Sequence, residues 1–434
     1  MNKILKRLVR LVVVVSIAST NPAVAQKIRG IIDGGQIRGI PTAIVPFKIV
    51  DGLELDTQID LVVAADLNAS GKFESIEAAA FMSMPSRPEE VRFKDWRFVD
   101  AEVLVIGEVW KLDKDKYEVQ FHIYDVAREQ QIGTGKRIPN LRERDLRTVA
   151  HIISDSVYQA FTGRPGAFHS RIAYIKRSEI EHQRYRYRLI VADWDGYNEK
   201  ELFASWQPLL SPSWSPDSKK IAFVSFTPKG PVVKVIDRLT GRHETIASYK
   251  GVNSAPAWSP DGTKIAYATS KNGSPDVYIY DVATKQHERV TTHYAIDTEP
   301  AWSPDGKSLL FTSSRTGKAQ IYTHVIGSDS STRATFEGKD NANASYDFEG
   351  KRVVMVHEGG QIVVMQAKTG QLTWLTNAKF DESPSFSPNG DMVLYAAEYD
   401  FQPALVVASS DGRVRTRVEF VKGDVREPAW SSLR

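Results

Sequence analysis

Several acidic residues stand just before a sequence that the chain repeats, which reads Pro-x-Trp-Ser-Pro in three copies and Pro-Ser-Phe-Ser-Pro or Pro-Ala-Trp-Ser in two later ones. The residues at these positions are Asp297, Thr298 and Glu299; Asp381 and Glu382; Asp424 and Glu427; and the neutral Asn253 and Ala255. Residues at equivalent positions of a closed repeat array lie around one ring, so we expect these side chains to converge at one opening. A ring of negative charge suits a basic or hydrogen-bonding peptide. A solvated loop rim and a loosely held cation are two further interpretations of the same residues.

The sequence carries none of the short motifs that mark common active sites. It has no G-x-S-x-G, no H-E-x-x-H, no P-loop and no G-x-G-x-x-G after a strand. The absence of cysteine excludes thiol catalysis and thiolate metal sites. The nine histidines are scattered, and His243 and His287 are 44 residues apart, which places them at one position of neighbouring repeats. The sequence therefore predicts no catalytic residue, no metal site and no cofactor.

The repeat defines the architecture. Its copies begin at Pro212, Pro256, Pro300, Ala344, Pro384 and Pro428, which are 44 residues apart except for one step of 40. Each unit holds short runs such as residues 264–269 and 277–281, whose length, alternation and flanking turn residues favour strands over helices. Four short strands in a unit of about 44 residues are typical of a propeller blade.

The Ser-Pro-Asp-Gly part of the repeat has a local reason. Proline sets φ for the second position of a type I turn, aspartate tolerates the third, and glycine takes the left-handed conformation that follows. The repeat is therefore one strand, a hairpin turn and the start of the next strand. In the fourth copy Asp347-Phe-Glu-Gly350 replaces the proline turn, which leaves the geometry of that turn open.

The two ends of the repeat region predict the number of blades. Residues 171–174 and 187–193 resemble the second and third strands of a blade that lacks its first strand, and the chain ends on a Pro-Ala-Trp-Ser strand with nothing after it. Joining these pieces completes a sixth blade and leaves no unpaired sheet edge. Residues 166–434 are thus expected to form a six-bladed β-propeller closed by the C-terminal strand.

The first 25 residues have the pattern of a secretory signal peptide: basic residues, the apolar run 11–17, and Ala23-Val-Ala25 as a cleavage signal. The run is too short to span a bilayer, so no membrane insertion is expected. Removing its four basic residues from 56 leaves 52 against 53 acidic residues, so the net charge gives no reason to expect nucleic-acid binding. An exported chain without cysteine fits the bacterial periplasm.

Residues 26–165 lack the repeat and are expected to form a small α/β domain. Helices are predicted over residues 57–68, with Ile59, Val62, Val63 and Leu67 on one face, and over residues 146–161. Strands are predicted over residues 43–47, 102–108 and 117–125. Residues 26–35 form a glycine-punctuated segment in front of this domain.

Two further patterns have competing interpretations. Residues 193–198 resemble part of a calcium loop but lack an acidic ligand position and the closing glutamate, so a hairpin turn is favoured. The repeated tryptophans could form a stacking platform for bases or sugars, but their equivalent positions in the blades favour packing between sheets. These tryptophans are Trp214, Trp258, Trp302 and Trp430.

Taken together, these parts resemble the TolB family of the Tol–Pal cell-envelope system over nearly all of the mature chain. The stretches that carry the resemblance outside the generic blade motif are residues 62–73, 155–163, 171–174, 195–198 and 298–300. The charged stretch from Glu179 to Arg188 is a local departure from the family pattern.

The resemblance implies a periplasmic scaffold without catalysis. Family members bind the peptidoglycan-associated lipoprotein Pal at the channel mouth and the inner-membrane-anchored protein TolA through the mature N-terminus, and the system acts in outer-membrane invagination during division and is exploited by colicins. The implied Pal-binding residues are Asn253, Ala255, Thr298, Glu299, Asp381, Glu382 and Glu427. The implied TolA-binding residues are Ile28, Arg29, Ile31, Ile32 and Asp33.

Two other classes of function remain as alternatives. Similar propellers occur in hydrolases, lyases and peptidases, but the chain has no hydrolase domain after its propeller and no His–carboxylate constellation on the predicted mouth. A generic scaffold for outer-membrane assembly, which also binds other outer-membrane proteins, differs from a TolB-like protein only in its partners.

Overall fold

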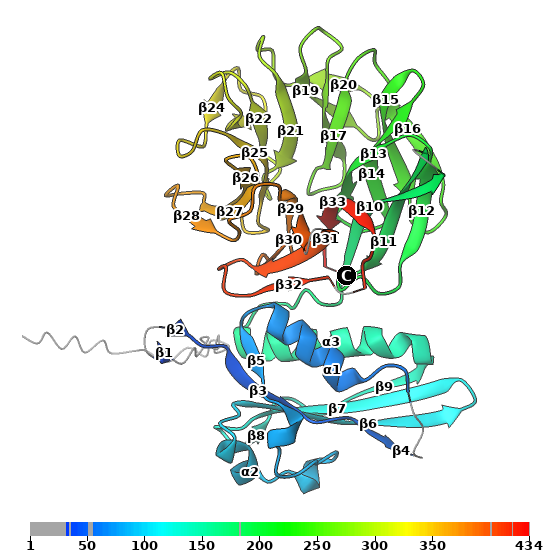
Figure 1. The fold of residues 1–434 in the computed structure, drawn as a ribbon, viewed down its shortest axis with the longest axis vertical. Helices are drawn as coiled ribbons and strands as arrows, with labels where there is room; N and C mark the ends of the chain where they lie inside the picture. Colours follow the sequence, from blue (N-terminus) through cyan, green and yellow to red (C-terminus); the bar gives the residue numbers. More distant parts are fainter. Residues whose placement is uncertain are drawn as a thin grey trace, which may run out of the picture.

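The computed structural model describes residues 32–33, 36–50, 55–181, 184–399, 402–418 and 420–433. These residues form a small α/β unit and a β-propeller. In Figure 1 the propeller is above and the α/β unit is below. The predicted signal peptide lies outside the described residues. In the described ranges, no helix is long and apolar enough to cross a membrane.

The α/β unit is built on a seven-stranded mixed sheet. Its main path is β5-β3-β6-β7-β8, with β4 beside β6 and β9 beside β7. The strands are β3 (Ile40–Ile44), β4 (Lys48–Val50), β5 (Phe73–Ser75), β6 (Val103–Asp113), β7 (Lys116–Asp125), β8 (Gln130–Gln131) and β9 (Lys136–Leu141). The alternating side chains of β6 divide between two cores, Val103 and Val105 on one face of the sheet and Leu104 and Ile106 on the other.

Helices α1 (Ile59–Ala69) and α3 (Leu146–Thr162) lie between this sheet and the propeller (Figure 1). The predicted apolar face of the first helix is buried as expected. Gly163 ends α3 in the left-handed conformation, φ 74°, where a side chain would be strained. The far face of the sheet is covered by α2 (Phe93–Phe98), whose Trp96 is buried. Short 3-10 turns are η1 (Ala78–Ala80), η2 (Pro88–Glu90) and η3 (Glu143–Asp145).

Six four-stranded antiparallel sheets form the propeller, as the repeat predicts. From the innermost to the outermost strand the blades are as follows. Blade 1 has β33 (Asp424–Trp430), β10 (Arg171–Glu181), β11 (Arg184–Asp193) and β12 (Lys200–Ser205); blade 2 has β13 (Leu209–Trp214), β14 (Lys220–Thr227), β15 (Gly230–Asp237) and β16 (His243–Ala247); blade 3 has β17 (Asn253–Trp258), β18 (Lys264–Thr269), β19 (Asp276–Asp281) and β20 (His287–Arg289). Blade 4 has β21 (Asp297–Trp302), β22 (Ser308–Ser313), β23 (Gln320–Val325) and β24 (Ser331–Arg333); blade 5 has β25 (Asn341–Tyr346), β26 (Arg352–His357), β27 (Gln361–Gln366) and β28 (Leu372–Trp374); blade 6 has β29 (Glu382–Phe386), β30 (Met392–Tyr399), β31 (Gln402–Ser409) and β32 (Arg415–Arg417).

The C-terminal strand closes the ring as predicted. β33 pairs with β10 through the register Ile172↔Trp430 and Ala173↔Ala429. The predicted turns also form: Ser259 donates to Asp261 at 2.6 Å, and Gly262 has φ 72°. Asp347-Phe-Glu-Gly350 makes the same turn without proline, since Gly350 has φ 69° and its N–H donates to the Asp347 carbonyl.

The repeated tryptophans pack between blades, which confirms the interpretation as core residues. Trp214, Trp302 and Trp430 are each less than a tenth exposed. The Nε1 atoms of Trp214 and Trp302 donate to carbonyls of the preceding blade, both at 3.1 Å. Trp258 occupies the same position, but its buried Nε1 has no hydrogen-bond partner among the described residues.

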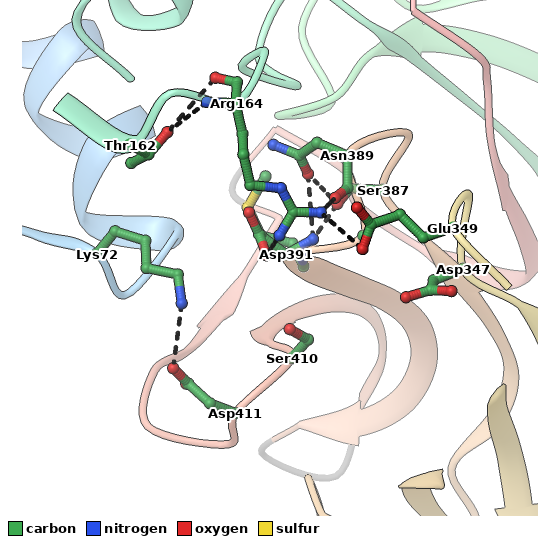
Figure 2. A network of polar contacts seen from close by, with 12 residues as sticks. Lys72, Thr162, Arg164, Asp347, Glu349, Ser387, Asn389, Asp391, Ser410 and Asp411 are labelled. Carbon is green, nitrogen blue, oxygen red and sulfur yellow. Dashed lines mark hydrogen bonds and ion pairs between the residues drawn. The ribbon is translucent and has the colours of Figure 1, made fainter. Parts of the chain in front are cut away.

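The α/β unit docks on the end of the propeller opposite to the starts of the inner strands. Figure 2 shows part of this interface, where Arg164 reaches from the end of α3 into blade 6. Its guanidinium donates to Asp391 at 3.0 Å and to the Asn389 carbonyl at 2.8 Å, and Tyr158 donates to Asp391 at 2.6 Å. Lys72 pairs with Asp411 of the same blade at 3.6 Å. One continuous apolar core also joins α1 and α3 to blades 1 and 6.

A second buried polar cluster joins the two units at blade 1. His151 of α3 contacts Asp66 of α1 at 2.8 Å and Asp195 of the β11–β12 turn at 3.4 Å. Arg147 donates to Asp195 at 2.7 Å, and Trp194 donates to Asp66 at 3.1 Å. Residues 193–198 thus form the predicted hairpin turn. Its Trp194 and Asp195 side chains bind the α/β unit to blade 1.

Candidate protein-binding site at the channel mouth

The same three backbone positions recur at the start of each inner strand of the propeller, and we call them the first, second and third mouth positions. The first is buried, the second is partly or fully exposed, and the third has a positive φ. The third mouth positions are Ser211, Ala255, Glu299, Asn343, Ser383 and Glu427, with φ between 48° and 54°. The register of each inner pair shifts there, which is the mark of a β-bulge.

These six bulges carry no glycine, although the left-handed conformation costs a residue with a side chain roughly 1 kcal/mol or more. Only Asn343 is of a type that tolerates the conformation well. Such strain persists where the surrounding structure holds it, and it clusters at functional sites. The bulges place six equivalent residues at the starts of the inner strands, opposite to the end of the propeller on which the α/β unit docks.

The first mouth positions support the mouth from inside the blades. The side chain of Asn253 has no exposed surface. It donates to the carbonyls of Tyr249 and Pro231, at 2.7 and 3.0 Å, and accepts from Thr269 at 3.0 Å. Asn253 therefore has no surface with which to touch a partner directly. Asp381, also at a first position, is only 2% exposed.

Glu299 and Glu427, at third mouth positions, tie neighbouring blades together. A carboxylate oxygen of Glu299 accepts the backbone N–H of Asn343 at 2.8 Å and the hydroxyl of Thr312 at 2.7 Å. Glu427 accepts the N–H of Ser211 in the same way, at 3.2 Å. In both pairs the acceptor and the amide belong to equivalent positions of adjacent blades, so the glutamates stabilise the strained bulges.

The structure brings three glutamates of the mouth within electrostatic reach of one another. Burial, followed by the charge of Glu382, raises the pKa of Glu427 to about 7; Glu299 adds to this shift, while the N–H of Ser211 and the charge of Arg426 oppose it. Glu382 is exposed, and Thr298 and Ala255 are partly exposed. The mouth therefore presents concentrated negative charge, which focuses the field inside a channel and attracts cationic groups.

Exposed apolar side chains surround this acidic centre. They lie on the connections between the outer strand of one blade and the inner strand of the next, shortly before the first mouth positions. These residues are Trp206, Val252, Tyr294, Ile296, Phe336 and Phe380, and Phe380 is 79% exposed. Exposed aromatic residues are enriched in protein-binding surfaces relative to the rest of a protein's surface.

The predicted N-terminal segment is described only in part. Ile28, Arg29 and Ile31 lie outside the described residues. Ile32–Asp33 forms β1, which pairs with β2 (Gln36–Ile37) in a sheet separate from the seven-stranded one.

The described residues contain no group of three or more His, Cys, Asp or Glu side chains placed to hold a metal ion. His287 contacts the Tyr267 hydroxyl at 2.9 Å and packs against Tyr280, within its own blade. His243 packs edge-on against Phe203 of the preceding blade. The two histidines thus have packing partners of their own.

The fold and this site define a six-bladed propeller protein with an acidic, aromatic-rimmed mouth. Comparison with known families narrows the class: residues 158–434 match the model of the TolB beta propeller domain, and residues 31–132 match that of the TolB amino-terminal domain.

Relatives match the chain over 92% of its length. The chain is 49% identical over 408 residues to the Tol-Pal system protein TolB of Xanthomonas oryzae pv. oryzae (strain MAFF 311018), with 92% of each chain covered. It is 48% identical over 411 residues to that of Xylella fastidiosa (strain 9a5c), again with 92% of each covered. The crystal structure of TolB from Acinetobacter baumannii superposes with a TM-score of 0.82 at 38% identity and covers 91% of this chain and 97% of that one. The chain belongs to the TolB family, and as such it is a component of the Tol-Pal system and not an enzyme.

Proposed function

We propose that the chain is a periplasmic scaffold that binds the lipoprotein Pal at the channel mouth and TolA through its N-terminal segment. By linking an outer-membrane partner to one anchored in the inner membrane, it supports outer-membrane invagination during division and the integrity of the envelope. Membership of the TolB family supports this role, and the predicted signal peptide supports the periplasmic location.

The observation that carries the Pal assignment is the combination of charge and apolar surface at the mouth. Glu299, Glu382 and Glu427 concentrate negative charge there, and exposed aromatic residues ring them. Thr298 and Ala255 are partly exposed at neighbouring mouth positions, Asp381 lines a pocket of the mouth, and Asn253 supports the mouth from within its blade. Negative charge of this kind steers the approach of a partner and fixes its orientation. The aromatic residues supply apolar surface that becomes buried on binding.

The N-terminal segment fits a partner that takes up an extended chain. β1 and β2 form a separate pair only two residues long, which is too short for stability of its own. A segment with Ile28, Ile31 and Ile32 as apolar residues, flanked by Arg29 and Asp33, is suited to adding a strand to the sheet edge of TolA.

Titration calorimetry tests the Pal assignment with the mature chain and the soluble domain of Pal. Glu382→Lys is the sharpest variant, because Glu382 is exposed and its replacement leaves the packing of the blade intact. Glu288→Lys, on the exposed outer strand of blade 3, is the matched charge reversal. We expect Glu382→Lys to weaken binding by roughly tenfold or more and Glu288→Lys to leave it unchanged. Equal affinities of all three proteins, or no binding by the unaltered chain, contradict the assignment.

A further inference from the structure

The mouth contains a pocket of about 470 Å³ where blades 5, 6 and 1 meet. Gly359 and Gly360 of the β26–β27 hairpin line one side, and Ala396 and Ala397 of β30 line another. Gly360 has φ 140°, and a Cβ there would lie 2.2 Å from the Lys379 carbonyl, so the hairpin packs closely against the connection that leads to Asp381. These small residues leave the space open.

Asp381 lines this pocket with a buried carboxylate that is incompletely satisfied. Thr376 contributes a hydrogen bond and Arg415 a favourable charge, but the Oδ2 atom of Asp381 is buried without a hydrogen-bond partner among the described residues. A buried charge of this kind is costly unless a donor meets it.

The other blades show what is missing at Asp381. Polar residues occupy the first mouth position in four blades, and in three of them the residue opposite on the next strand bonds to it. These pairs are Asn253 with Thr269 at 3.0 Å, Asp297 with Ser313 at 2.7 Å and Asn341 with His357 at 2.8 Å. In blade 6 the register places Ala397, which has no donor, opposite Asp381.

Blade 4 also shows which group meets an aspartate here. The second oxygen of Asp297 accepts from the guanidinium of Arg315 at 2.7 Å, two residues beyond Ser313. The equivalent position of blade 6 is Tyr399, so this strand carries no arginine there. Blade 6 thus has the carboxylate but no arginine at the register of Arg315, and Arg415 acts on Asp381 through its charge while the Oδ2 atom has no hydrogen-bond partner among the described residues.

The rim of the pocket favours a cation from outside. Glu382 and Glu398 are exposed there, against one positive side chain, Arg426, which is already paired with Asp424 at 3.0 Å. Phe380, largely exposed, lies at the same rim and offers a ring face on which a planar guanidinium can stack.

We propose that this pocket receives the guanidinium group of an arginine from a protein that binds the mouth, with Asp381 as its buried ion-pair partner. The inference rests on the proposed function for the identity of that protein, Pal, but not for the chemistry of the pocket. Arginine fits better than lysine because an N–H of its planar guanidinium can donate to the open Oδ2 atom, as Arg315 donates to Asp297, while its flat face stacks on Phe380.

A first experiment tests the chemistry alone. N-acetyl-L-arginine amide is titrated into the mature chain, with the citrulline analogue, which has the same shape and no charge, as control. We expect the arginine compound to bind the unaltered protein roughly tenfold or more tightly than the Asp381→Asn variant, and the citrulline compound to bind neither. Tyr399→Arg, which places an arginine at the register of Arg315, is expected to abolish binding and to raise the thermal midpoint. Equal binding by Asp381→Asn, binding of citrulline, or no binding of the arginine compound to the unaltered protein overturns the proposal.

A second experiment separates this inference from the proposed function. The soluble domain of Pal is titrated into the same proteins. Loss of at least tenfold in affinity for Asp381→Asn and Tyr399→Arg supports both claims. Undiminished binding of Pal by Asp381→Asn overturns the arginine pocket and leaves the function in place. Binding of the arginine compound without any binding of Pal leaves the pocket in place and overturns the function.

Discussion

His151 is expected to stay an imidazolium cation at neutral and mildly alkaline pH. Its side chain is 1% exposed and lies between the carboxylates of Asp66 and Asp195. Burial alone lowers the pKa of a histidine, but the charges and hydrogen bonds of these two carboxylates outweigh it and raise the pKa of His151 to about 10. The cation bridges α1, α3 and the β11–β12 turn of the propeller, so its charge bears on how firmly the two units hold together.

The pKa shift of Asp195 gives the size of the contribution that this ion pair makes to the free energy of unfolding. Burial favours a higher pKa for this carboxyl group, but His151 first and then Arg147 and the N–H of Tyr197 lower the pKa to about 2, from an ordinary value of 3.8. A shift of this size corresponds to about 2 kcal/mol, and the shift of His151 describes the same ion pair and is not added to it. Asp195→Asn is therefore expected to lower the free energy of unfolding by about 2 kcal/mol at pH 7.

The stability that the His151–Asp195 pair contributes is expected to be lost both at alkaline and at strongly acidic pH. A raised histidine pKa contributes stability that is fully present below 6.5 and is lost as the pH rises toward 10. A lowered aspartate pKa contributes stability that is present above 3.8 and is lost as the pH falls toward 2. The cost of Asp195→Asn is thus expected to be largest between about pH 4 and 6.5 and to shrink at alkaline pH.

Two measurements check this prediction. NMR of the histidine ring nitrogens from pH 5 to 10.5, with His151→Gln to assign the signal, follows the charge directly. Urea unfolding of the unaltered chain, Asp195→Asn and the exposed control Glu288→Gln gives the free energies. A His151 signal that titrates near pH 6.5, or an Asp195→Asn variant as stable as the control at pH 6, refutes the reasoning.

Trp302→Phe should cost about 1 kcal/mol more stability than Trp258→Phe in urea unfolding, because only Trp302 loses a hydrogen bond from its Nε1 atom; equal costs contradict this. The raised pKa of Glu427 means that its ionisation opposes folding, so stability should fall as the pH rises from 5 to 8, and Glu427→Gln should flatten that profile; an unchanged slope contradicts it. Deletion of residues 27–33 should abolish TolA binding in a pull-down and leave the thermal midpoint unchanged; a large drop in the midpoint means that the segment is structural instead.

Much of the propeller could be predicted because its signals are local and repeated. The Ser-Pro-Asp-Gly turn depends on the φ preferences of four adjacent residues, and the alternation within each strand depends on the pleat. Both features can therefore be predicted from a few adjacent residues of the sequence. The closing pair β33–β10 followed from the need to leave no open sheet edge.

The parts that could not be predicted depend on contacts between distant residues. Asp66 stands within an apolar helix sequence, and its partners His151 and Trp194 lie 85 and 128 residues away. The bulges at the mouth could not be predicted from the sequence either. Their left-handed positions carry no glycine that would indicate them, because packing between the blades stabilises the conformation. Asp381 resembles Asp297 in sequence context, and only the register reveals that Ala397 and not a serine lies opposite it.

Pal is expected to bind at the mouth and not at the end of the propeller on which the α/β unit docks. Hydrogen–deuterium exchange of the mature chain with and without the soluble domain of Pal tests it most directly. We expect slower exchange over residues 249–255, 292–299 and 377–383, at the starts of three inner strands, and no change over residues 193–198 and 410–414 at the opposite end. Protection confined to the opposite end, with the mouth unchanged, contradicts the account.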